Sequence, residues 1–328
     1  MKILNYDLVV IGGGPGGMAA AIQAKKAGAE RILIIERNEY LGGILMQCIH
    51  TGFGLTYYEE NLTGPEYAER FINIIEKEMI DALLDATVLS ITGDKLIEVL
   101  SKEQGYLQVQ AKSIVLAMGC RERPAGAMQI YGTRPAGVMT AGAAQKLLNM
   151  EGLRIGQEIV ILGSGDIGLI MARRLTLEGA KVIAVIEKEK RPSGLIRNIV
   201  QCLEDFDIPL YLSTTVTEIT GNNRVESVSI APVDENGNVK WDENKEIPCD
   251  TLLIAAGLIP ENELSLTAGV ELTKGSGGAL VNAEKATSVS GIFACGNVVR
   301  VHETVDDVTI EGELAGESAA KFLLQGGR

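Results

Sequence analysis

Two glycine-rich segments share one spacing with an acidic residue further along the chain. Gly12-Gly13-Gly14-Pro15-Gly16-Gly17 is followed by Glu36, and Gly163-Ser164-Gly165-Asp166-Ile167-Gly168 is followed by Glu187. In both copies the acidic residue comes 24 positions after the first glycine. Such glycines permit a tight turn and a close approach to a pyrophosphate, and the carboxylate accepts hydrogen bonds from ribose hydroxyls. The pattern therefore indicates two sites for dinucleotides, with the phosphates at helix N-termini.

The elements around each copy are those that the pattern requires. Residues 7–11 form an apolar strand before the first copy, residues 18–27 a helix after it, and residues 31–35 a second strand. In the second half, residues 158–162 and 181–186 are the corresponding strands, and a helix between them reaches residue 178. An isolated GxGxxG match is a weak signal, but two copies in the strand–turn–helix context predict two βαβ units.

After its βαβ unit, each half continues in the same way, with a helix, several short strands and then a buried strand. A helix capped by Thr63, Pro65 and Glu66 is expected to about residue 79, and a final helix over about 309–324. The other expected elements are strands 86–92, 95–101, 106–110, 113–118, 216–219, 224–231 and 251–256, a helix near 194–205 and a solvated hairpin tip over 234–246. The predicted fold class is α/β. It has two Rossmann-like domains, each of three layers in the order β, β, α.

Composition excludes several classes of function. The 328 residues carry a net charge of −13, which argues against nucleic acid and anionic membranes as partners. No apolar run approaches the ~20 residues of a membrane span, and the first residues do not read as a signal peptide. The five cysteines form no CxxC pair, and the two histidines are far apart, so no metal site is predicted. Unpaired thiols fit a cytoplasmic protein.

At this point the chain resembles the pyridine nucleotide–disulfide oxidoreductase superfamily along essentially its whole length. The resemblance rests on the two fingerprints with Glu36 and Glu187, on Ala117-Met118-Gly119, and on Gly291-Ile-Phe-Ala-Cys-Gly-Asn297. It implies FAD in the first half and NAD(P)H in the second. It also implies that residues 124–261 form an NAD(P)-binding domain inserted into a FAD-binding domain made of residues 1–123 and 262–328.

The resemblance assigns cofactor roles to individual positions. The FAD positions are Gly12, Gly14, Pro15, Gly17, Glu36, Arg37, Gly43, Val88, Ala117, Gly119, Gly296, Asn297, Val308 and Thr309. The NAD positions are Gly163, Gly165, Asp166, Ile167, Gly168, Glu187 and Gly257. Gly296 and Asn297 are expected at the ribityl chain, and the backbone near Val308 and Thr309 at the flavin C2 carbonyl. Glu187 favours the free ribose of NAD over the 2′-phosphate of NADP, although Lys188, Lys190 and Arg191 follow it.

Within the superfamily, residues 134–145 and 294–303 resemble FAD/NAD subunits of multi-subunit dehydrogenases. These include the alpha subunits of sarcosine oxidase and hydrogen cyanide synthase, and an oxidoreductase paired with glycerol-3-phosphate dehydrogenase. Three departures from the superfamily pattern stand out. Only Cys48 follows Gly42-Gly43 where disulfide reductases carry CxxxxC, Met118 replaces a threonine, and Asn297 replaces the usual aspartate. A dithiol reaction therefore lacks its second cysteine.

Other polar residues leave alternatives open. Cys48 and His50 are either a redox or acid–base pair at the flavin, or a buried thiol beside a polar loop residue. Cys120, Cys202, Cys249 and Cys295 are interpreted as structural. His302, Glu303, Asp306 and Asp307 either gate the flavin edge or contact a partner, or form a solvated turn whose acids cap the last helix; the turn is the favoured interpretation.

The sequence therefore predicts an FAD-dependent NAD(P)H oxidoreductase in which hydride passes between nicotinamide and flavin N5. The second half-reaction has no evident site, so a partner dehydrogenase or electron-acceptor subunit is expected. One alternative is a non-catalytic subunit whose nucleotides are structural. Another is a stand-alone reductase of disulfides or thiol acceptors that uses Cys48.

Overall fold

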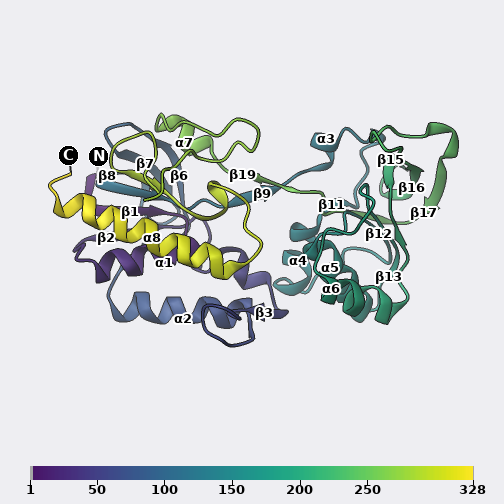
Figure 1. The fold of residues 1–328 in the computed structure, drawn as a ribbon, viewed down its shortest axis with the longest axis horizontal. Helices are drawn as coiled ribbons and strands as arrows, with labels where there is room; N and C mark the ends of the chain where they lie inside the picture. Colours follow the sequence, from purple (N-terminus) through teal and green to yellow (C-terminus); the bar gives the residue numbers. More distant parts are fainter. Residues whose placement is uncertain (1–2, 328) are drawn as a thin grey trace. The chain divides into compact units, whose positions relative to one another are not determined.

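The computed structural model describes residues 3–327, and the chain divides into two compact units (Figure 1). Unit 1 comprises the chain up to Arg121 and again from Ile259, and unit 2 comprises Glu122–Leu258. The chain passes between the units along strands β9 (Cys120–Glu122) and β19 (Leu258–Pro260), which pair with each other. Unit 2 is thus an insertion within the sequence of unit 1.

Unit 1 is built on a seven-stranded sheet with β1 (Ile3–Ile11) near its centre. The order is β5-β2-β1-β8-β7-β6, and β20 also pairs with β8. The bounds are β2 (Ile32–Ile35), β5 (Asp81–Leu83), β6 (Ala86–Ile91), β7 (Leu96–Ser101), β8 (Gly105–Leu116) and β20 (Ile292–Ala294). Strands β5, β2, β1, β8 and β20 are parallel, whereas β7 runs antiparallel to β8 and β6.

The alternation of side chains along β1 divides unit 1 into layers. Leu8 and Val10 pack against the helices α1 (Pro15–Lys26), α2 (Gly64–Lys77) and α8 (Val305–Leu324). Val9 and Ile11 point to the opposite face, where side chains of β6, β7 and residues 268–298 enclose them. Because both faces are covered, the central strand residues 8–11, 32–35 and 114–116 are all apolar.

Unit 2 repeats this plan around a five-stranded parallel sheet, β11-β18-β12-β13-β14. The bounds are β11 (Val138–Thr140), β18 (Thr251–Ile254), β12 (Glu158–Leu162), β13 (Lys181–Ile186) and β14 (Leu210–Tyr211). Helices α4 (Ala141–Asn149), α5 (Asp166–Leu177) and α6 (Ile196–Cys202) contribute to the core on the side of Ile159 and Ile161.

A second, four-stranded sheet covers the other face of unit 2, on the side of Val160 and Leu162 (Figure 1). Its order is β10 (Tyr131–Gly132), β15 (Thr214–Gly221), β16 (Val225–Pro232) and β17 (Lys245–Pro248). The predicted α/β class and the two Rossmann-like units are confirmed. The short elements that remain are η1 (Gly43–Gln47), β3 (Thr51–Phe53), β4 (Leu62–Thr63), α3 (Ala125–Met128), η2 (Glu204–Phe206), η3 (Trp241–Glu243), α7 (Glu263–Thr267) and η4 (Gly296–Val298).

Three expected boundaries are wrong. Residues 106–110 and 113–118 form one strand, β8, because the long β1 pairs with it past residue 112. The expected helix 194–205 is the shorter α6, followed by the separate turn η2. The last helix begins at Val305 and not near Thr309, because the side chain of Thr304 accepts a hydrogen bond from the backbone N of Asp307.

Candidate functional site

The first fingerprint lies between β1 and α1, as its glycines require. Gly12 has a φ of +103°, and a Cβ there would collide with the carbonyl oxygen of Ala117 at the end of β8. A Cβ on Gly17 would collide with the carbonyl oxygen of Gly12. A Cβ on Gly14 would meet no atom within 4 Å. Two glycines are therefore required by packing, and Gly14 borders open space at the N-terminus of α1.

Glu36 is buried at the end of β2, beside this turn. Its Oε2 accepts a hydrogen bond from the backbone N of Gly13 at 2.7 Å. Its Oε1 accepts from the backbone N of Asn38 at 2.8 Å and from Nδ2 of the same residue at 2.9 Å. These donors fix the carboxylate next to the open space at Gly14, where it can accept further hydrogen bonds from a ligand hydroxyl.

The second fingerprint repeats the backbone contacts of the first. Gly163 has a φ of +109°, and a Cβ there would collide with the carbonyl oxygen of Ala255 after β18. Oε2 of the buried Glu187 accepts from the backbone N of Ser164 at 3.0 Å, and Oε1 accepts from that of Glu189 at 2.9 Å. Near Gly165, only Oγ of Ser193 lies within 4 Å of an added Cβ.

One difference between the copies is the side chain of Ser164, where the first copy has Gly13. The hydroxyl of Ser164 donates to Oε2 of Glu187 at 2.5 Å and accepts from the backbone N of Ser193 at 3.1 Å. Asp166, at the first turn of α5, accepts from Leu195 and Asn198. The segment after Glu187 is thereby fixed over the second fingerprint. Ile167 and Gly168 continue α5, and Gly257 has a φ of +97° with open space around it.

Most of the other positions expected to bind FAD lie at the carboxyl ends of strands of unit 1. Ala117 and Gly119 follow β8, and β20, which precedes Gly296 and Asn297, pairs with β8. Gly43 lies against Gly14, since a Cβ on Gly43 would be 2.9 Å from Cα of Gly14. In an open parallel sheet, ligands bind outside the carboxyl ends, where the strand order reverses.

Arg37 and Val88 are two further positions of unit 1 that are expected to bind FAD. Arg37 is exposed, and its guanidinium lies 3.5 Å from the carboxylate of Glu261. Val88 is on β6, partly buried against the core.

The start of α8 differs from the expectation for Val308 and Thr309. Because α8 begins at Val305, the N–H groups without a partner inside the helix belong to residues 304–307. Cγ1 of Val308 would lie 3.2 Å from a Cβ on either Gly16 or Gly296, so this side chain fills the gap between those turns. Thr309 is fully buried, and its hydroxyl lies 2.7 Å from that of Tyr67.

Cys48 and His50 lie in the segment between η1 and β3. The thiol of Cys48 is buried and donates to the carbonyl of Ile44 at 3.3 Å, and burial raises its pKa to about 12. Nδ1 of His50 lies 3.1 Å from the carbonyl oxygen of Thr51, and the ring packs on Phe53. A thiol with so high a pKa is a poor nucleophile, so the geometry favours the structural interpretation of Cys48.

The role of Asp306 was not evident from the sequence. This buried carboxylate accepts hydrogen bonds from the backbone N of Gly54, Thr56 and Tyr57, at 3.1, 2.7 and 3.1 Å. Residues 41–54, LGGILMQCIHTGFG, form a third glycine-rich segment, outside the two fingerprints. Asp306 ties the end of this glycine-rich segment to the first turn of α8. The expected solvated turn over residues 302–307 is therefore wrong for Asp306, and also for the buried side chain of His302. The partners of both lie far away in the sequence or on another element, so no local pattern could identify them.

Cys202, Cys249 and Cys295 are buried, as the structural interpretation requires, and burial raises the pKa of Cys202 and Cys249 to about 11. Cys120 is only partly buried and lies 3.5 Å from Nδ2 of Asn297. None of the five cysteines forms a disulfide.

Unit 2 has a hollow of about 300 Å³ beside the carboxyl ends of β11 and β18. Its lining includes Arg134, Thr140 and Ile254, and the guanidinium of Arg134 donates to carbonyl oxygens of residues 130, 132 and 133. The strand order reverses between β18 and β12. Strands β11 and β18, whose ends border the hollow, lie on one side of this point, and β13 lies on the other. The hollow is a place where the remainder of a nucleotide bound at Gly165 can extend.

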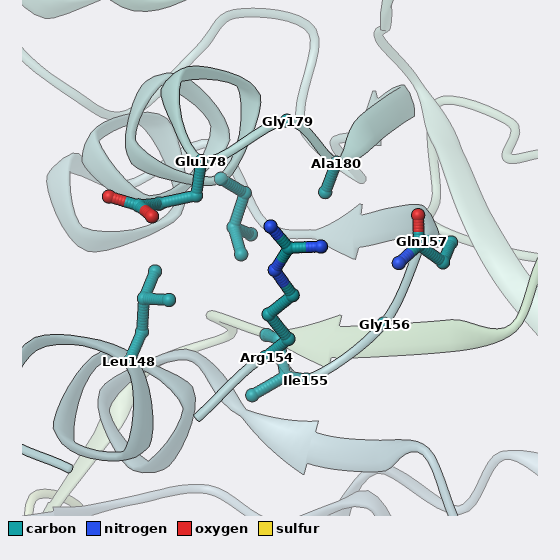
Figure 2. A pocket seen from close by; sticks show the side chains of 9 residues that line it. Leu148, Arg154, Ile155, Gly156, Gln157, Glu178, Gly179 and Ala180 are labelled. Carbon is teal, nitrogen blue, oxygen red and sulfur yellow. The ribbon is translucent and has the colours of Figure 1, made fainter. Parts of the chain in front are cut away.

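A second hollow of unit 2 lies at the opposite ends of the strands. Figure 2 shows it among Leu148, Arg154, Gln157 and Glu178, next to the residues that precede β12 and β13. Its volume of about 10 Å³ is room for about one water molecule. It is too small for a nucleotide and distant in the fold from the fingerprint. Over residues 3–327 no His, Cys, Asp and Glu cluster could hold a metal ion.

No helix within the described part of the chain has the length and apolar character needed to cross a membrane.

Comparison with known proteins gives a consistent result. The family model described as "Pyridine nucleotide-disulphide oxidoreductase" matches residues 6–312. Hydrogen cyanide synthase subunit HcnB of Pseudomonas protegens is 26% identical over 82% of this chain and 60% of its own length. An opine oxidase subunit of Agrobacterium tumefaciens is 30% identical over 81% of this chain and 55% of its own length. The chain thus spans little more than half the length of these relatives.

Among solved structures, thioredoxin reductase of T. acidophilum has the same fold. The TM-score is 0.80, with 22% identity, and the match covers 98% of this chain and 99% of that one.

Proposed function

The chain belongs to the pyridine nucleotide-disulphide oxidoreductase family, and on that premise we propose that unit 1 binds FAD, unit 2 binds NAD(H), and a partner dehydrogenase subunit exchanges electrons with the flavin. Members of this family are FAD-dependent NAD(P)H oxidoreductases, so the chain is an enzyme of that class with FAD and NAD(P) as cofactors.

One observation carries the assignment of two nucleotide sites. Glu36 and Glu187 each accept one hydrogen bond from the backbone N of the residue after the first glycine of their fingerprint. Each accepts a second from the backbone N of the residue two positions after the glutamate itself, Asn38 or Glu189. A plain βα turn needs no such carboxylate, whereas a ribose diol requires an acceptor at this place. Both sites are therefore built for the ribose of a dinucleotide.

The residues of unit 1 fit FAD. Gly14 leaves open space at the N-terminus of α1 for a pyrophosphate, and Gly43 allows the neighbouring segment to approach within van der Waals contact. Asn297 and Gly119, which follow adjacent strands of the sheet, are the residues to hold the ribityl chain. Bound FAD supplies the chemistry, acceptance of a hydride equivalent from NAD(P)H, while the protein binds and orients it.

The environment of Glu187 supports NAD as the nicotinamide nucleotide. A buried carboxylate repels a 2′-phosphate, and it is held in place by Ser164 and Glu189. Lys190 is engaged by Glu235 at 2.9 Å, which reduces the positive charge offered to a phosphate. The hollow beside Thr140 and Ile254 supports a path for the nicotinamide half.

The cysteines do not support a disulfide reductase. A dithiol reaction needs two sulfur atoms within bonding reach, and the one cysteine of the glycine-rich segment, Cys48, is a buried thiol with a raised pKa. Electron transfer to a partner subunit is the simpler outcome. HcnB and the opine oxidase relative are both named as subunits, which supports a multi-subunit dehydrogenase. The link to glycerol 3-phosphate rests on the sequence resemblance alone.

The test is an anaerobic titration of the FAD-loaded protein with NADH and with NADPH, followed by the flavin absorbance near ~450 nm. We expect bleaching by NADH at near-stoichiometric amounts and at least about tenfold weaker binding of NADPH. If the protein holds FAD but neither nucleotide bleaches the flavin, the result favours the alternative that the chain is a non-catalytic assembly subunit.

Glu36→Gln and Glu187→Gln are matched variants for this titration, because each carboxylate accepts from two backbone N–H groups at equivalent positions. Glu36→Gln is expected to weaken FAD about tenfold and leave the binding of NADH within about twofold of wild type; Glu187→Gln is expected to do the reverse. Equal effects of both variants on both nucleotides would count against the assignment of one cofactor to each unit.

A further inference from the structure

A buried cluster of charged side chains lies behind Asn297. The side chain of His302, 3% exposed, has two acceptors at its ring. Nδ1 lies 3.2 Å from Oδ1 of Asn297, and Nε2 lies 3.2 Å from Oε2 of Glu311 on α8. Nε2 has no hydrogen bond of good geometry to any described residue, so Glu311 is its ion-pair partner.

The orientation of the Asn297 amide follows from its neighbours. The backbone N–H of His302 points to the amide at 3.0 Å, and an N–H can only donate. The atom that faces it must therefore be Oδ1, because Nδ2 at that place would bring two donors together. Nδ2 then points to Sγ of Cys120 at 3.5 Å. Since Oδ1 can only accept, Nδ1 of His302 must carry a proton.

The second ring nitrogen must also carry a proton. Glu311 accepts from the backbone N of Gly296 at 2.6 Å and from Nζ of Lys285 at 2.5 Å. A neighbouring ammonium and a backbone N–H donor both favour the charged form of a carboxyl, so Glu311 is ionised. A bare lone pair on Nε2 would face a carboxylate oxygen at 3.2 Å and be repelled. A proton there makes an ion pair instead.

We propose that His302 is a buried imidazolium and a positioning residue, whose ring and backbone N–H together hold Asn297 so that the amide presents an N–H of Nδ2, and not its oxygen, to the FAD site. This inference rests on the proposed FAD site in unit 1. Both lone pairs of Oδ1 are engaged by His302, through its backbone N–H and its Nδ1–H. The ligand atom at this position must accordingly be an acceptor, a hydroxyl or phosphate oxygen of the cofactor. An aspartate would offer the opposite polarity.

The protonation state can be observed directly, because the chain has two histidines. ¹⁵N NMR of the ring nitrogens, with Glu311 ionised at about pH 8, distinguishes imidazolium from neutral imidazole, and His50→Gln assigns the signals. We expect both nitrogens of His302 to show protonated shifts. One unprotonated ring nitrogen would overturn the imidazolium. This measurement does not require FAD, so it stands apart from the proposed function.

The positioning role is tested with two substitutions that each keep one of the two contacts. Asparagine at position 302 can still donate to Asn297 from the place of Nδ1, whereas glutamine reaches Glu311 from the place of Nε2. We expect His302→Asn to leave the dissociation constant of FAD within about twofold of wild type, and His302→Gln to raise it about tenfold. Thermal melts of the apoproteins show whether both variants fold.

A double-mutant cycle separates positioning from general damage. If His302 acts through Asn297, His302→Gln weakens FAD no further once Asn297→Ala is present. Additive losses, or an unchanged affinity in His302→Gln, would overturn the positioning role. A wild-type protein that holds no FAD would overturn both this role and the proposed function, whatever the NMR result for the ring.

Discussion

Cys48 lies in the glycine-rich segment that has no counterpart in the second half of the chain, and its surroundings limit what its thiol can do. Its side chain is buried, donates to the carbonyl of Ile44, and has a pKa raised to about 12. At neutral pH almost none of the Cys48 side chain is in the thiolate form, which is the form that reacts.

We therefore expect Cys48→Ser to keep the rate of flavin reduction by NADH within about twofold of wild type, because serine retains the donor to Ile44. The rate is measured by stopped flow, and labelling of native protein with a thiol reagent should be slow at this position. A loss of about a hundredfold or more in the serine variant would return Cys48 to the reaction.

Glu311 makes a pH-dependent contribution to stability. Its folded-state pKa, about 2, lies below the value near ~4.3 of an unfolded chain. The stabilisation is therefore complete above the unfolded value and is lost as the pH falls toward 2; it amounts to about 3 kcal/mol. Urea unfolding of Glu311→Gln should show a deficit at about pH 7 that shrinks between about pH 4.5 and about pH 2.

Glu303→Gln, an exposed neighbour in the sequence, is the control for this series. A deficit in Glu311→Gln that stays constant from about pH 7 to about pH 2.5 would contradict the assignment of the low pKa to this carboxyl.

At the scale of elements, α1 and α8 approach each other through small residues. A Cβ on Gly312 would collide with the carbonyl oxygen of Gly16, and one on Gly316 with that of Ala20. Leu8 and Val10 of β1 are buried beneath these helices. The distance between the two helices is consequently set by the absence of side chains at the crossing.

Gly316→Ala should therefore destabilise unit 1 by about 1–3 kcal/mol, because the added methyl group has no space and α8 must move. Gly93→Ala is a matched control in the same unit, since the nearest atom to its added Cβ is 3.9 Å away. Equilibrium urea unfolding gives both values. Equal stability of the two variants would show that the helices separate without cost.

The elements that the sequence predicts well are those that local patterns define. The two βαβ units follow from glycine spacing and apolar runs, and the capping box of α2 follows from Thr63 and Glu66. The start of α8 was missed because Thr304 gave no signal stronger than the later residues. The partners of Asp306 and His302 were missed because Gly54 is far from Asp306 in the sequence, and because His302 precedes the helix that carries Glu311, so that no helical period relates the two. Sequence spacing carries no information on such contacts.

At the scale of the whole molecule, each unit has its own sheet and its own buried clusters. The core of unit 1 is built around Leu8 and Val9, and that of unit 2 around Ile159 and Val160. The chain passes between the units at β9 and β19 only. The units therefore have the means to unfold as separate cooperative entities.

Scanning calorimetry of the apoprotein should accordingly show two transitions, each shifted by one cofactor. A ligand at about 100 times its dissociation constant stabilises the unit that binds it by about 2.7 kcal/mol. We expect FAD to raise the transition of unit 1 and NADH that of unit 2. Gly14→Ala should abolish the first shift and Gly165→Ala the second, while each alanine is tolerated in the apoprotein, because no atom lies closer than 3.8 Å to the added Cβ. A single transition that both nucleotides shift together would mean that the units unfold as one.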